Sequence, residues 1–181
     1  VAQKEIRKLH RLSLMNEWAD FLLKLLNKHK KEYMTFMYGE DHALLYHETA
    51  GKTVFSVPKR FDIIESSGNI PEKGFAVFHF FPVTVENREV FEYRLQKRPR
   101  KLGYAEDFLA MRILRPVKHN TYLIITCWKN KKAFESWKER EKFFAAGEKD
   151  LAIEVNKRKM YTDYSYLREY IIGTGDEEES R

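Results

Sequence analysis

The side chains whose types and spacing could do chemistry lie between residues 79 and 128. His79 interrupts the apolar run FAVFHFFPV, where an imidazole either ligates a metal ion or is buried with a hydrogen bond to the backbone. Arg94 and Arg98 are four residues apart, so a helix would place both guanidinium groups on one face, suited to two carboxylates. A solvated helix end or contact with nucleic-acid phosphates would explain the same pair. Trp128 ends the apolar run TYLIITCW and offers a large rigid surface to a ligand, a core or an interface.

Cysteine and the other histidines support less chemistry. Cys127 is the single cysteine of the 181 residues, so no internal disulfide can form, and we expect a reducing, cytoplasmic setting. In an apolar run such a thiol usually behaves as a small hydrophobic side chain. His42 and His47 are five residues apart and would face opposite sides of a strand, which makes them a poor metal pair. The sequence has no GxGxxG, P-loop or GxSxG motif, so nucleotide binding and serine hydrolysis lack local support.

The candidate residues belong to an alternation of strands and helices over residues 74–172. The run FAVFHFFPV predicts a buried strand, and residues 85–98 have amphipathic helical spacing. Two more strands, FLAMRILRP and TYLIITCW, then one or two short helices over 133–149 and an aromatic last strand are expected. This is the α+β ferredoxin-like order, in which helices cover one face of an antiparallel sheet. The other face would stay apolar, which suggests a homodimer.

The chain before residue 74 has a different pattern. Residues 1–32 place apolar side chains three or four positions apart among lysines and arginines, which predicts a basic amphipathic helix. We expect it to dock on the protein's own body, and contact with a membrane surface or a partner is the alternative. Residues 33–73 predict a small β-meander of three strands, the third at TVFSV, with one helical turn over 61–65. The turn-rich segment 66–74 is the predicted boundary, and residues 173–181 form an acidic tail.

Charge and hydropathy limit the partners. The net charge is +6, and residues 1–32, with eight basic and four acidic side chains, contribute +4 of it. The rest of the chain is close to neutral, so we expect no specific nucleic-acid binding. No stretch approaches the roughly 20 apolar residues of a spanning helix, and no signal peptide is expected.

The runs FEYRLQKRP, FLAMRILRP, TYLIITCW and AFESW together resemble the antibiotic-biosynthesis-monooxygenase (ABM) superfamily, specifically its haem-degrading monooxygenases of the IsdG and HmoB type. The resemblance covers roughly residues 74–172. The preceding stretch TFMYGEDHALLYHETAGKTVFSVP resembles the extra β module of two-part members, which include the signal-transduction protein TRAP. Residues 1–32 resemble nothing that we can place.

The resemblance implies a dimer of ferredoxin-like subunits that forms a central β-barrel, the dimeric α/β-barrel. Each subunit would hold haem between its helices and the sheet. Trp128 stands where the family has the tryptophan that distorts the haem plane, and Arg94 with Arg98 would hold the haem propionates. Two positions depart from the family. His79 replaces its asparagine, and Gly147 stands where its iron-ligating histidine falls. Since glycine has no donor side chain, haem would bind through His79 as the metal ligand, or without the family's ligation.

Two functional hypotheses follow from this resemblance. The first is a haem-degrading monooxygenase, in which haem is substrate and cofactor, an external donor supplies electrons, and Trp128 and His79 form the catalytic pair. The alternative is a non-catalytic, TRAP-like regulatory or haem-binding protein, which the glycine at position 147 favours. A third and weaker hypothesis is nucleic-acid or membrane association through residues 1–32 and 94–101.

Overall fold

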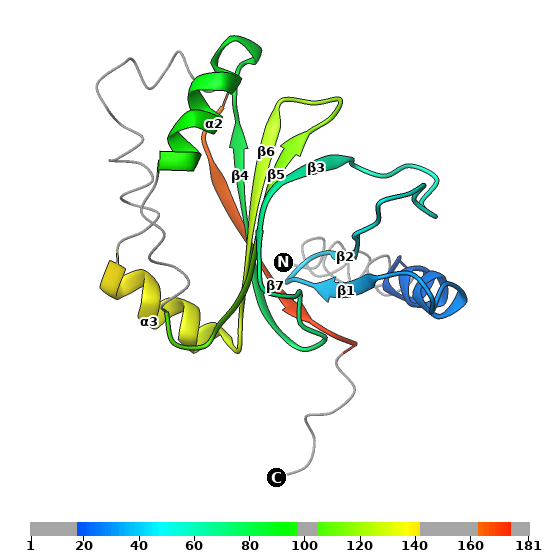
Figure 1. The fold of residues 1–181 in the computed structure, drawn as a ribbon. Coiled ribbons are helices and arrows are strands. Elements are labelled where there is room, and N and C mark those ends of the chain that lie inside the picture. Colours follow the sequence, from blue (N-terminus) through cyan, green and yellow to red (C-terminus); the bar gives the residue numbers. More distant parts are fainter. Residues whose placement is uncertain (1–17, 98–104, 142–162, 175–181) are drawn as a thin grey trace, which may run out of the picture. The chain divides into compact units, whose positions relative to one another are not determined.

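The computed structural model describes residues 18–97, 105–141 and 163–174 (Figure 1). The chain divides into two compact units. The first comprises residues 1–58, 72–74 and 169–181, and the second comprises residues 59–71 and 75–168. Strand β7, Tyr166–Ile172, runs through both units, and the strand order of the sheet is β2-β1-β7-β4-β6-β5-β3.

The second unit has the predicted ferredoxin-like order. Its elements follow the chain as β4 (Gly74–Pro82), the 3₁₀ turn η1 (Val85–Asn87), α2 (Arg88–Lys97), β5 (Phe108–Pro116), β6 (Thr121–Trp128) and α3 (Lys131–Glu141), before β7. Helices α2 and α3 lie on the same side of β4, β5 and β6 (Figure 1). The predicted α+β fold class is therefore confirmed, while the homodimer stays a prediction.

Strands β4 and β6 are largely apolar, and both of their faces are buried. They pair antiparallel, with Phe75 opposite Trp128 and His79 opposite Ile124. Alternating residues on the side of α2 and α3 form one core with those helices, which contribute Phe91, Leu95, Phe134 and Trp137. The residues between them are apolar too, as predicted for the second face, and are buried: Ala76, Phe78, Leu123, Ile125 and Cys127.

The sequence-based prediction of a helical turn over residues 61–65 is wrong. Residues Phe61–Ser67 form strand β3, which pairs antiparallel with β5 and has an irregularity between Ile63 and Glu65. None of the seven residues of β3 is fully buried, as expected for a strand at the edge of a sheet.

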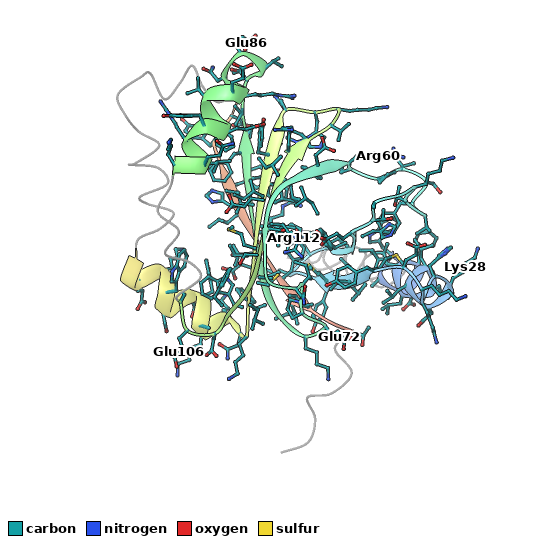
Figure 2. All side chains as sticks on the ribbon, viewed as in Figure 1. Lys28, Arg60, Glu72, Glu86, Glu106 and Arg112 are labelled. Carbon is teal, nitrogen blue, oxygen red and sulfur yellow. The ribbon has the colours of Figure 1, made fainter. Side chains whose placement is uncertain are left out.

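A buried arginine fixes the end of β3. Arg112 on β5 is 5% exposed and lies within the sheet in Figure 2. Its Nη1 donates to the carbonyl oxygens of Ser67 (3.2 Å), Gly68 (2.9 Å) and Met111 (2.9 Å). Gly68 has φ +65°, and a Cβ there would lie 2.0 Å from the carbonyl oxygen of Leu109. Only glycine fits this turn, because both the backbone angle and the space exclude a side chain.

The first unit contains a helix over residues 18–28, strand β1 (Met34–Tyr38) and strand β2 (Ala43–His47). The helix docks on these strands as expected, with Leu22 buried against Phe36 and Ala43. Strand β1 also pairs with β7, joining Met37 to Ile172. Residues 1–17 of the predicted N-terminal helix and most of the acidic tail lie outside the described residues.

The prediction of a third strand in the meander, over residues 53–57, is wrong. This segment contains no regular secondary structure. Thr53 is instead held by a side-chain contact, since its Oγ1 lies 3.0 Å from Nδ1 of His47. Among the described residues, no helix is long and apolar enough to cross a membrane.

Candidate functional site

Trp128 lies at the end of β6 in an aromatic cluster beneath α3. Its ring centroid is 5.0 Å from that of Trp137, 5.5 Å from Phe108 and 5.8 Å from Phe134, and its side chain is fully buried. The indole Nε1 donates to Oγ1 of Thr126 at 3.0 Å. This bond places both side chains on the same face of β6, as strand alternation predicts, and it fixes the orientation of the indole.

His79 lies on the same helix-facing side of the sheet. Alternation along β4 puts it between Val77 and Phe81, both members of the core, and its ring centroid is 4.0 Å from that of Phe81. The side chain is 5% exposed, and burial lowers the pKa of the imidazole to about 4. At neutral pH the ring is therefore uncharged and carries a nitrogen lone pair, the form in which histidine binds metals.

Strand register sets the separation of these two candidates. Trp128 pairs with Phe75, which is four residues from His79 along β4. At about 3.3 Å per residue the offset along the strands is roughly 13 Å. His79 thus lies between the aromatic cluster below α3 and the residues Phe91 and Tyr122 near α2.

The remaining candidates are less well described. Arg94 is half-buried on α2. Arg98 and Gly147 lie outside the described residues, so their predicted roles stay predictions.

A polar network that the sequence analysis did not predict joins α2 to the sheet. Arg115 on β5 donates from Nε and Nη2 to the two carboxylate oxygens of Glu92 on α2, at 2.7 and 2.5 Å. The hydroxyl of Tyr122 donates to the same carboxylate at 2.5 Å. The hydrogen bond from Arg115 is the largest cause that lowers the pKa of Glu92, and burial, followed by the bond to Glu92, raises the pKa of Tyr122 to about 12. At neutral pH an anionic carboxylate thus accepts all three bonds.

Cys127 is not part of this face. It alternates with Trp128 and Thr126 on β6, is fully buried, and burial raises the pKa of its thiol to about 12. The thiolate is the reactive form, so this cysteine behaves as the hydrophobic side chain that its sequence context predicts. Among the described residues, no group of three or more His, Cys, Asp and Glu side chains could hold a metal ion.

Comparison with known proteins agrees with this architecture. The model of the antibiotic biosynthesis monooxygenase family matches residues 74–149, the segment that runs from β4 through α3. We refer to this segment, residues 74–149, as the ABM domain because the family model matches it. The resemblance predicted from the sequence is therefore confirmed, and β4, α2, β5, β6 and α3 are its elements.

Curated relatives of the ABM domain have two kinds of name. A signal transduction protein TRAP from Staphylococcus aureus is 29% identical over 105 residues, 58% of this chain and 63% of that protein. A heme-degrading monooxygenase from Listeria monocytogenes is 23% identical over 119 residues, 66% of this chain and 71% of that protein. The alignment with TRAP thus spans less than two thirds of that relative's length.

Solved structures show the same fold. A major regulator of staphylococcal pathogenesis superposes with a TM-score of 0.74 at 22% identity, over 83% of this chain and 91% of that one. A heme-degrading enzyme from Listeria monocytogenes superposes with a TM-score of 0.64 at 19% identity, over 84% and 92%. At these identities the likeness establishes the fold, and function has to be argued from the residues of the ABM domain.

Proposed function

We propose that the ABM domain binds haem on the helix-facing side of its sheet, between α2 and α3, and degrades it oxidatively. The observation that carries the proposal is that an uncharged imidazole, His79, and a fixed indole, Trp128, share this buried face. A haem-degrading relative with the same domain supports it. A homodimer and an external electron donor belong to the same proposal.

The residues of this face fit haem in their chemistry. The neutral nitrogen of His79 is the donor type that haem iron accepts, and the surrounding aromatic side chains suit the apolar face of a porphyrin. Arg94, on α2, would hold one propionate, and Arg98, four residues later in the sequence, would hold the other. Trp128 is fully buried in the described state, so haem would have to part α3 from the sheet to touch it.

Each residue would have a separate task. Bound haem supplies an iron centre at which oxygen is activated. His79 would hold the iron, and Trp128 would contact the ring, with its indole kept in place by Thr126, Phe134 and Trp137. Because tryptophan is large and rigid, its contact can bend a planar ligand rather than yield to it.

A non-catalytic, TRAP-like role is the second candidate. Close packing around Trp128 and the glycine at position 147 favour it, as do relatives named TRAP. In that case the same face binds haem without turnover, or the fold serves regulation with the core closed.

A haemin titration of the full chain, followed by a reductant in air, separates these functions. We expect haemin to give a saturable shift of the Soret band in either case. After the reductant is added in air, the band should bleach for an enzyme and persist for a sensor or carrier. His79→Asn should weaken or shift the Soret band, and Trp128→Phe should leave binding largely intact while slowing the bleaching. His119→Asn, the same substitution in the turn before β6, is the matched control and should change neither. The absence of any Soret shift with the wild-type chain would refute haem binding altogether.

A further inference from the structure

The helix over residues 18–28 has two apolar faces, and the hairpin of β1 and β2 covers only one of them. On the covered face, Leu22 is buried against Phe36 of β1. On the other face, Trp18 is 51% exposed and Phe21 is 53% exposed. Large apolar side chains that are exposed next to one another, rather than singly, mark a surface that contacts something other than water. Docking on the hairpin therefore leaves a second apolar surface of this helix exposed.

Trp18, Phe21 and Leu25 form this second surface, which we call the apolar stripe. The rings of Trp18 and Phe21 stack, with centroids 5.5 Å apart and an angle of 25° between their planes. Leu25 is half-buried and, at about 100° per residue, lies between the two aromatic residues around the helix axis. The indole Nε1 of Trp18 donates to the carbonyl oxygen of Ala43 at 3.1 Å. The polar group of the indole is thus satisfied within the chain, and the exposed remainder of the ring is apolar.

Lysines follow one edge of the apolar stripe. Lys24 and Lys28 are both exposed, and their spacing of four residues places them one turn apart, next to Phe21 around the helix axis. Asp20 is the single acidic residue between positions 18 and 28, and it lies beyond Lys24, further from the stripe. The exposed side of the helix is therefore apolar along the stripe and positively charged beside it.

The acidic residues of this segment do not balance its charge. Residues 18–32 contain four lysines and two carboxylates. One of these carboxylates, that of Glu32, lies 3.0 Å from Nε2 of His47, whose side chain is buried. The excess of positive charge beside the apolar stripe favours a partner that is anionic and also accepts apolar side chains.

A lipid surface meets both requirements better than a protein surface does. The cores of protein interfaces are depleted in lysine. At a lipid surface, the long stems of Lys24 and Lys28 can lie along the apolar region while their ammonium groups reach the lipid phosphates. Tryptophan and phenylalanine are typical of the apolar faces of helices that lie at this boundary.

We propose that the helix over residues 18–28 binds the surface of an anionic lipid membrane. The apolar stripe enters the boundary between headgroups and acyl chains, and Lys24 and Lys28 contact the phosphate groups. The opposite face of the helix stays on the hairpin, so the helix lies in the plane of the surface rather than crossing it. This inference is independent of haem binding, because its residues lie outside the ABM domain.

The test mixes the full chain with vesicles of phosphatidylcholine and phosphatidylglycerol in equal parts and records tryptophan emission. Trp128 and Trp137 are buried, so a change in emission on binding reports on Trp18. We expect a blue shift and protection from acrylamide, with little change for vesicles of phosphatidylcholine alone. Raising the salt from about 0.1 M to about 1 M shortens the screening length from about 10 Å to about 3 Å and should weaken binding several-fold. Trp18→Phe should remove the blue shift while the chain still sediments with the vesicles.

A double variant tests the lysines. Lys24→Gln with Lys28→Gln should weaken binding to the anionic vesicles about 10- to 30-fold, because each basic residue near such a surface contributes roughly 5-fold. Lys52→Gln with Lys132→Gln is the matched control. Both of these lysines are exposed, one in the first unit and one on α3, and their replacement removes the same net charge. The control should bind nearly as the wild type does.

A single variant tests the apolar stripe. Phe21→Ser should weaken binding about 5- to 10-fold, because less apolar surface leaves water. Val57→Ser is its matched control, since Val57 is 95% exposed in the same unit but lies outside the helix. This substitution should leave binding unchanged.

Three results would overturn the proposal. The first is the absence of a blue shift with anionic vesicles. The second is an equal loss of binding in both double variants, which would indicate attraction by net charge alone. The third is a blue shift that grows with protein concentration without vesicles, which would assign the apolar stripe to a contact with a second copy of the chain. The first and third results need only the wild-type chain, so the proposal is falsifiable even where a variant fails to fold.

Discussion

The buried imidazole of His79 should make the protein sensitive to mild acid. Its pKa is lowered by burial from 6.5 to about 4, so the unfolded chain binds a proton between these values and the folded chain does not. Stability must therefore fall as the pH drops from about 6.5 to 4, and it should be unaffected by this group above and below that range. The complete shift corresponds to about 3 kcal/mol, of which about 2 kcal/mol is lost between pH 7 and pH 5.

His79→Asn removes the titrating group and keeps a polar side chain of similar size. Between pH 7 and pH 5, the free energy of unfolding measured with urea should fall by about 2 kcal/mol more for the wild type than for this variant. This difference corresponds to roughly 4–8 °C in Tm for a chain of this length. Comparing the two pH dependences, rather than the two stabilities, cancels any constant cost of the buried amide.

Ile124→Val is the control, because Ile124 pairs with His79 across the strands and has no titratable group. It should lower the free energy of unfolding by about 1 kcal/mol at every pH and leave the pH dependence of the wild type intact. If the free energies of unfolding of the wild type and His79→Asn instead change equally between pH 7 and pH 5, then the imidazole is not buried in its neutral form and the reasoning fails.

Three further predictions concern contacts of the second unit. Glu92→Gln should cost about 1–2 kcal/mol at pH 7, because Arg115 loses its charge partner near the surface, and the difference from the wild type should shrink as the pH falls and the lowered carboxylate pKa is reached. Urea unfolding at pH 7 and pH 3.5 would measure it. Gly68→Ala should destabilise by about 1–3 kcal/mol in thermal unfolding, since φ is +65° and its Cβ would meet the carbonyl of Leu109. Cys127 should stay unreactive toward a thiol reagent in the native protein and react fully in denaturant, and rapid native labelling would contradict its burial.

Much of the ABM domain was predictable because burial on both faces turns strands into long apolar runs. β4 and β6 are such runs, and an amphipathic helix follows each of them, so element type and order were evident. β3 was missed for the opposite reason. Its acidic residues and exposed face give it weak strand character, whereas residues 53–57 have high strand propensity but no pairing partner in the fold.

The candidate site was predictable in type and only partly in arrangement. Alternation alone places Trp128 with Thr126 on one face, and the structure has their side chains bonded. The carboxylate of Glu92 could not be foreseen, since its partners Arg115 and Tyr122 come from two strands whose register the sequence does not specify. The same holds for the contact between His42 and Tyr170, which are 128 residues apart.

The sharing of β7 has a consequence for how the chain is synthesised. Strand β1 is made before β7, yet β7 is one of its two neighbours in the sheet, and residues 166–172 follow β1 by more than 120 residues. During translation the hairpin of β1 and β2 must wait with an unpaired edge, the kind of surface that invites pairing with other chains. We expect nascent chains that stop before residue 166 to associate with chaperones or aggregate, and release of the last strand to be the event that commits both units to the native fold.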